Sequence, residues 1–117
     1  MKTAGLLLTV LLGFAGQDAN KKEVTLRGEV LDQHCFMIHH GSGPDHAGCS
    51  NACISRNVSI GFLAGDGEFY VLLGETLNSV KEKVNQMAGK PAVLKGFLET
   101  RGGLKANRMT SIEVSEE

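Results

Sequence analysis

The chain has 117 residues and a formal net charge of −1 at pH 7. A charge so close to zero provides no basic surface for neutralising phosphates, so the composition argues against nucleic acid as a partner. The lack of Trp and the single Tyr also leave few aromatic platforms on which bases could stack.

Residues 1–19 have the pattern of a secretory signal peptide. A positively charged start precedes a mostly apolar run, and the small residues Gly13 and Ala15 fit cleavage after Ala15, with cleavage after Ala19 as a second option. The run is shorter than the roughly 20 apolar residues that cross a bilayer, and no basic cluster follows it to favour an uncleaved anchor. We therefore predict export to the periplasm or the medium, and a single domain over residues 20–117 without a membrane span.

The first half of this domain reads as three strands separated by one long insertion. Residues 24–30 alternate apolar and polar side chains, which is typical of a half-buried strand. Residues 32–57 break the alternation with a glycine-rich loop. Residues 58–63 and 69–73 then predict two strands joined by a tight turn at Asp66–Gly67.

The second half predicts a helix and two further strands. Apolar residues from 77 to 87 recur at helical spacing, and Gly89 followed by proline ends that pattern. Residues 93–100 and 104–114 predict the last two strands, with a bulge or bend within 108–111. Three strands, a helix and two strands form the order β-β-β-α-β-β of the OB-fold, a five-stranded barrel. We therefore expect a mainly β, OB-like barrel; an open antiparallel sheet packed on one helix is the alternative.

All three cysteines and all four histidines lie between residues 34 and 53, in the predicted insertion. Residues 45–53 can form a short helix between the first two strands, because a proline precedes them and an acid begins them. On that helix His46, Cys49 and Cys53 share one face. A cysteine at the end of the first strand can fold back to join them. The predicted ligands are Cys35, His46, Cys49 and Cys53, a Cys₃His set that suits zinc or Cu(I).

Other donors lie beside this predicted site, and other uses of the cysteines stay open. The additional donors, either direct ligands or groups that orient a ligand from outside, are Asp32, His34, His39 and His40. In an exported chain Cys49 and Cys53 could instead form a disulfide, or Cys35 could pair with either of them. One cysteine would then remain free, or a pair would cycle between thiol and disulfide.

The spacing D-x-x-C at residues 32–35, followed by H-x-x-C-x-x-x-C at residues 46–53, resembles a group of small exported bacterial proteins with OB-like domains. These proteins are largely uncharacterised, and the resemblance covers about residues 24–114. It implies a periplasmic or extracytoplasmic setting without implying a reaction. The shared site that it implies consists of Asp32, Cys35, His46, Cys49 and Cys53.

The functional expectation is a non-enzymatic, exported module that binds copper or zinc. The chain has no P-loop, no G-x-S-x-G motif and no haem-attachment motif. Its expected partners are the metal ion and another exported protein. The alternatives are a thiol–disulfide redox protein, and an OB-type ligand-binding or adaptor module that contains a structural disulfide.

Overall fold

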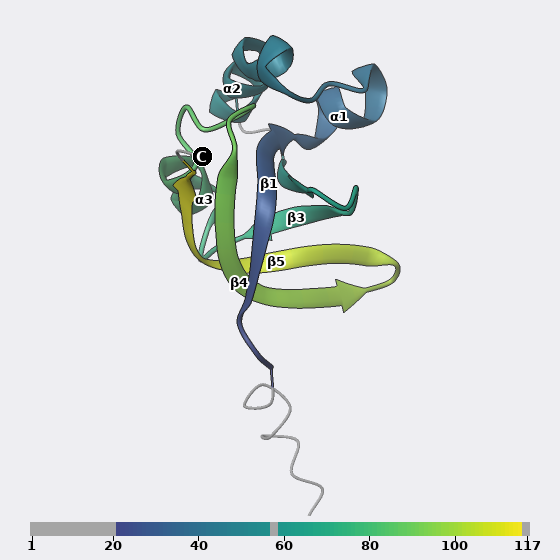
Figure 1. Cartoon of the computed structure of the whole chain (residues 1–117), viewed down its shortest axis with the longest axis vertical. Coiled ribbons are helices and arrows are strands. Elements are labelled where there is room, and N and C mark those ends of the chain that lie inside the picture. The colour runs from purple at the N-terminus through teal and green to yellow at the C-terminus, as the bar shows by residue number, and fades with distance from the viewer. Residues whose placement is uncertain (1–20, 57–58, 116–117) are drawn as a thin grey trace, which may run out of the picture.

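The computed structural model describes residues 21–56 and 59–115, and it is mainly β (Figure 1). The predicted signal peptide, residues 1–19, lies outside the described residues. Within the described ranges, no helix has both the length and the apolar character needed to cross a membrane. The elements are β1 (Val24–Asp32), α1 (Gln33–His39), the 3₁₀ turn η2 (Pro44–His46), α2 (Ala47–Ser55), β2 (Ile60–Ala64), β3 (Phe69–Leu73), α3 (Leu77–Lys83), β4 (Ala92–Arg101) and β5 (Leu104–Val114).

The five strands form one sheet that closes into a ring in the order β1-β2-β3-β5-β4. The ring closes because β1 pairs with β2 through its second half and with β4 through its first half. β3 and β5 run parallel, and the other pairs are antiparallel. The prediction of five strands with a helix between the third and fourth is confirmed, and the alternative of an open sheet is wrong.

The order of elements differs from the prediction between β1 and β2. We expected a loop and one short helix there, but the segment contains α1, η2 and α2. The additional helix α1 begins because the Asp32 carboxylate accepts a hydrogen bond from the backbone N–H of Cys35 at 2.7 Å. It ends where His40 adopts a left-handed conformation with φ of 53°. The sequence showed no helical periodicity across these seven residues.

Two further element boundaries differ by a few residues from the predicted ones. β2 begins at Ile60, and α3 ends at Lys83, although the apolar spacing extended the predicted helix to Met87. The chain leaves the helix early because Gln86 has a positive φ of 60°, and the backbone N–H of Met87 closes a tight turn onto the Val84 carbonyl at 2.9 Å. The apolar side chains after Lys83 therefore line a turn, where Val84 and Ala88 are still fully buried.

The long β4–β5 hairpin bends where a bulge was expected. Lys95 pairs with Ser111 but the next residue, Gly96, pairs with Met109, so Thr110 has no partner on β4. An additional residue on one strand increases its local twist and bends the ladder, and both strands curve strongly in Figure 1. The prediction of a bulge within 108–111 is confirmed.

The core fills the ring and fixes α2 against it. Buried strand residues include Val30, Phe62, Leu72, Leu94 and Met109, and α3 adds Val80. Ile54 of α2 belongs to the same cluster, and its exposed fraction is 4%. The Asn51 side chain of α2 also accepts a hydrogen bond from the Ala88 backbone at 3.2 Å. Figure 1 shows α1 and α2 together at one end of the ring, beyond the C-terminal end of β1.

Candidate metal centre

The fold gathers the three cysteines at the end of the ring where α1 and α2 meet. The Cys35 sulfur of α1 lies 3.4 Å from the Cys49 sulfur and 3.8 Å from the Cys53 sulfur, both on α2. All three sulfurs lie within 4.8 Å of one another, and all three are free thiols. The predicted approach of Cys35 to the two helical cysteines is therefore confirmed.

Local structure explains why these sulfurs meet. The Asp32 cap fixes the first turn of α1, where Cys35 lies. Cys49 and Cys53 are four residues apart on α2, so their side chains project from the same face of that helix. The loop between the helices passes close by at Gly41, where a Cβ would lie at an ordinary contact distance of 3.5 Å from the Cβ of Cys35.

The spacing of the sulfurs suits a shared ion. A zinc ion with tetrahedral Zn–S bonds of about 2.3 Å separates its sulfur ligands by about 3.8 Å. The two sulfur–sulfur distances of 3.4 and 3.8 Å are close to this value. A disulfide bond is much shorter, at about 2.05 Å. The arrangement is thus compatible with metal binding, and it does not indicate which metal.

His46 lies near the three cysteines, but its imidazole is not grouped with their sulfurs. It is half-buried, and its Nδ1 would stand 3.3 Å from a Cβ placed on Gly41, on the side that Cys35 also approaches. Its ring nitrogens are not among the atoms that lie within 4.8 Å of all three sulfurs. Whether His46 acts as the fourth ligand therefore stays a prediction.

The additional donors divide into two groups. Asp32 and His34 place ligand atoms within 4.8 Å of each other and of the Cys35 sulfur, so they form a second group that shares this cysteine. His39 and His40 are exposed and belong to neither group. The ring of His39 instead contacts that of His34 edge-on, with centroids 5.9 Å apart.

Sequence reasoning missed the aromatic contact that fixes α1 onto the sheet. The ring of Phe36 stacks on that of Phe69 in β3, with centroids 4.8 Å apart and planes within 9° of parallel. Gly61 of β2 leaves room for this stack, because a Cβ there would lie 2.0 Å from the Phe69 ring. The only signal in the sequence was an apolar Phe36 beside Cys35. No local pattern predicts a pairing across this distance in the chain.

The three thiols differ in exposure, and the pKa of the Cys35 thiol is raised. Cys35 is 4% exposed, Cys53 is half-buried and Cys49 is exposed. The hydrogen bond with Cys49, burial, and the neighbouring Asp32 carboxylate raise the pKa of the Cys35 thiol far above its ordinary value of 9.0. Because the thiolate is the reactive form, the raised pKa and the burial of Cys35 both slow its reaction with an electrophile in the metal-free chain.

Alkylation of the reduced, metal-free chain should follow this order. We expect iodoacetamide at neutral pH to modify Cys49 first and Cys35 last, and peptide mass spectrometry reads the order directly. Modification in urea provides the control, because unfolding removes the differences in burial and all three thiols should then react at similar rates. Equal rates for Cys35 and Cys49 in the folded chain would contradict the arrangement of the cluster.

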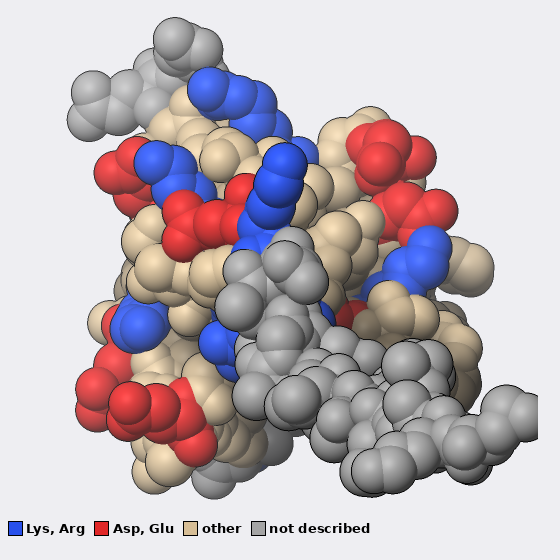
Figure 2. Space-filling model, turned by 90° about the horizontal axis from the view of Figure 1, so that it is seen from below, with Lys and Arg blue, Asp and Glu red and all other residues tan. Residues whose placement is uncertain are grey.

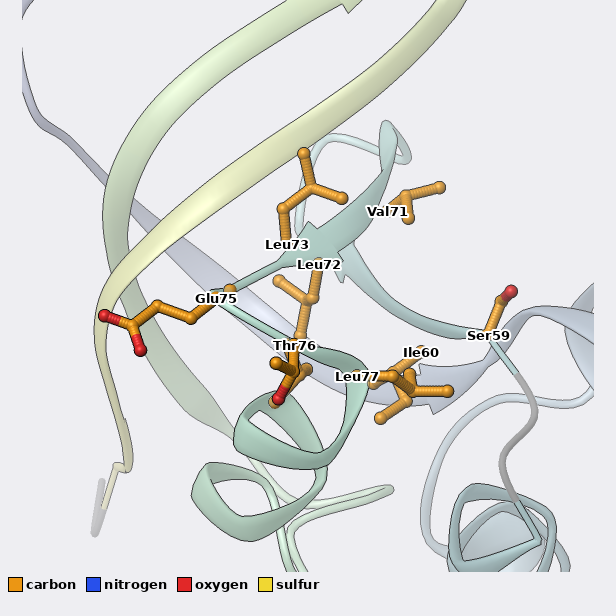
Figure 3. A pocket seen from close by; sticks show the side chains of 10 residues that line it. Ser59, Ile60, Val71, Leu72, Leu73, Glu75, Thr76 and Leu77 are labelled. Carbon is orange, nitrogen blue, oxygen red and sulfur yellow. The ribbon is translucent and has the colours of Figure 1, made fainter.

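One apolar hollow beside α3 is separate from the cysteines. A cavity of about 310 Å³ lies between β3 and the start of α3, and Figure 3 shows mostly aliphatic side chains around it. Its one carboxylate, Glu75, points away from Ile60 and Leu77 in that view. With no cysteine or histidine in its lining, this cavity offers none of the cluster's chemistry.

Surface charge and comparison with known proteins add no further class of function. Figure 2 shows acidic and basic side chains interspersed on the face in view, without a continuous basic area. This agrees with the net charge of −1.

No protein-family model and no curated protein matches the chain.

Proposed function

We propose that the chain is an exported module in which Cys35, Cys49 and Cys53 bind one copper or zinc ion. The observation that carries the proposal is the spacing of the sulfurs, 3.4 and 3.8 Å from Cys35. This spacing is near the distance of about 3.8 Å expected around a tetrahedral ion with thiolate ligands. Three thiolates form a soft donor set, which suits Cu(I) as well as Zn²⁺.

His46 is the proposed fourth ligand. Its Nδ1 and the Cβ of Cys35 both lie within 3.5 Å of a Cβ placed on Gly41, and ligation would require its imidazole to turn toward the sulfurs. No side chain caps η2, and the residue before it, Gly43, has φ of 77°. The start of η2 is held to β1, because the Gly43 backbone N–H donates a hydrogen bond to the Glu29 carboxylate at 2.7 Å, so the movement would come from the His46 side chain.

The metal has a structural consequence in this proposal. Neither α1 nor α2 is longer than nine residues, and helices of this length are marginal without tertiary contacts. A metal ion coordinated by Cys35 and Cys49 would cross-link them, so that binding energy would contribute to folding. We also infer that the ring is an OB-like barrel, because its strand order and parallel β3–β5 pairing accompany a helix between β3 and β4.

Metal content and thiol count together test this function. The chain would be purified without added metal and examined by elemental mass spectrometry, with thiols counted under denaturing, chelating conditions. One copper or zinc ion per chain with all three thiols free is the expected result. A metal-free chain with only one free thiol would show that two cysteines are bonded, which contradicts the proposal.

A thiol–disulfide protein is the second candidate, and the contact of 3.4 Å between Cys35 and Cys49 favours it. A modest rotation of either side chain would bring these sulfurs to bonding distance. Oxidation would release two protons and pass two electrons to an external disulfide or quinone. The two functions differ in stoichiometry, because a redox pair predicts reversible loss of two thiols without any bound metal.

A further inference from the structure

Asp32 is a buried carboxylate that the hydrogen bonds of the fold only half satisfy. Its side chain is 0% exposed. Its Oδ2 accepts the capping hydrogen bond from the Cys35 backbone at 2.7 Å. Its Oδ1 is buried and has no hydrogen-bond partner in the described part of the chain. A buried carboxylate oxygen without a partner is costly, and a bound cation is one way to offset that cost.

The proposed metal increases this demand for positive charge. Three thiolates around one Zn²⁺ carry a net charge of −1, and around one Cu(I) they carry −2. Asp32 would add another negative charge beside Cys35, in an interior where like charges repel strongly. The ion pairs seen among residues 21–56 and 59–115 involve other carboxylates, Glu68 and Glu99.

The neighbouring side chains provide the ligands for a second ion. The ligand atoms of Asp32, His34 and Cys35 lie within 4.8 Å of one another. Carboxylate, imidazole and thiolate are all ligands of Zn²⁺ in proteins. His34 is exposed, so an ion could enter from its side and keep water in its remaining position.

We propose that Asp32, His34 and Cys35 form a second divalent-cation site of the kind that Zn²⁺ occupies, next to the three-cysteine site. The Cys35 thiolate would bridge the two ions, since it belongs to both groups of ligand atoms. The second ion would neutralise the Asp32 carboxylate. Because Cys35 is shared, this inference rests on the proposed function.

Zinc stoichiometry separates the two sites. The reduced, metal-free full chain would be titrated with Zn²⁺, and bound ions counted by native mass spectrometry. We expect two ions in the wild type, and one in Asp32→Asn and in His34→Ala. Asn still caps helices well, so Asp32→Asn should keep α1 and the first site. His34 is exposed, so its replacement by Ala tests the second site without altering the core.

The matched control is Asp66→Asn. Asp66 is an exposed aspartate in the β2–β3 turn, and Asn can still accept the hydrogen bond that Asp66 receives from the Glu68 backbone at 3.0 Å. This variant should bind two ions. A wild type that binds only one ion would overturn the second site and leave the proposed function standing. Two ions in both Asp32→Asn and His34→Ala would overturn it as well. A wild type that binds neither Zn²⁺ nor, in a parallel titration, Cu(I) would overturn the proposed function itself.

Discussion

Replacing Cys49 by Ser should lower the affinity for copper or zinc by more than about 100-fold, a larger loss than removal of an outer partner of a metal ligand causes. Cys49 is exposed, and its sulfur is 3.4 Å from that of the buried Cys35. Its loss removes a ligand without opening a cavity in the core. The metal-free variant should therefore melt within a few degrees of the metal-free wild type, and competition with a chelator measures the affinity.

The neighbouring Gly48 offers a control on the same helix. A Cβ at Gly48 would meet no atom within 4 Å, so Gly48→Ala should leave the metal affinity unchanged. It should also stabilise the chain by up to about 1 kcal/mol, because Gly is the poorer helix former. Full stoichiometric binding by Cys49→Ser, at wild-type affinity, would refute the three-cysteine site.

Gly28→Ala should destabilise the chain by at least about 3 kcal/mol, the upper end of the usual cost of overpacking. Gly28 is the residue at which β1 passes from pairing with β4 to pairing with β2, opposite Ala92 and Ala64. A Cβ there would lie 2.0 Å from the carbonyl oxygen of Leu63 and 2.9 Å from the Cα of Ala64. Both contacts are with backbone atoms, so an added Cβ would fit only if β1 and β2 moved apart, which would open the ring of strands. Chemical denaturation of the metal-free chain measures the change.

Gly65→Ala is the matched control for this substitution. Gly65 follows β2, and a Cβ there would lie at an ordinary 3.7 Å from the Arg27 carbonyl oxygen. Its free energy of unfolding should change by less than about 1 kcal/mol. If Gly28→Ala were as stable as Gly65→Ala, the close approach of β1 and β2 would be wrong, and with it the closure of the ring.

Most of the sheet could be predicted from the sequence because its strands alternate between core and solvent. The alternation from Val24 onward marks β1, and the polar stretch after Arg108 marks the bulge, which the register confirms at Thr110. The helix α1 could not be predicted in this way. Its start depends on one capping carboxylate, Asp32, and its position depends on the stacking of Phe36 on a residue of β3.

The three cysteines of the candidate site could be predicted from the sequence, but the positions of His46 and Asp32 could not. Cys49 and Cys53 lie on one short segment, so helical spacing alone places them together, and the structure adds Cys35 as expected. The position of His46 depends on the transition from η2 to α2, which shifts its side chain relative to the α-helical spacing assumed from the sequence. The burial of Asp32 depends on how the end of β1 packs, which a local pattern does not reveal.

X-ray absorption at the edge of the bound metal tests the central claim most directly. The chain would be purified without added metal, or loaded with one equivalent of Zn²⁺ or Cu(I) if it were isolated without metal. Three sulfur neighbours at about 2.3 Å are the predicted result, since Cys35, Cys49 and Cys53 would all be ligands. A shell of nitrogen and oxygen atoms alone, with three thiols still open to alkylation in the metal-loaded chain, would contradict it.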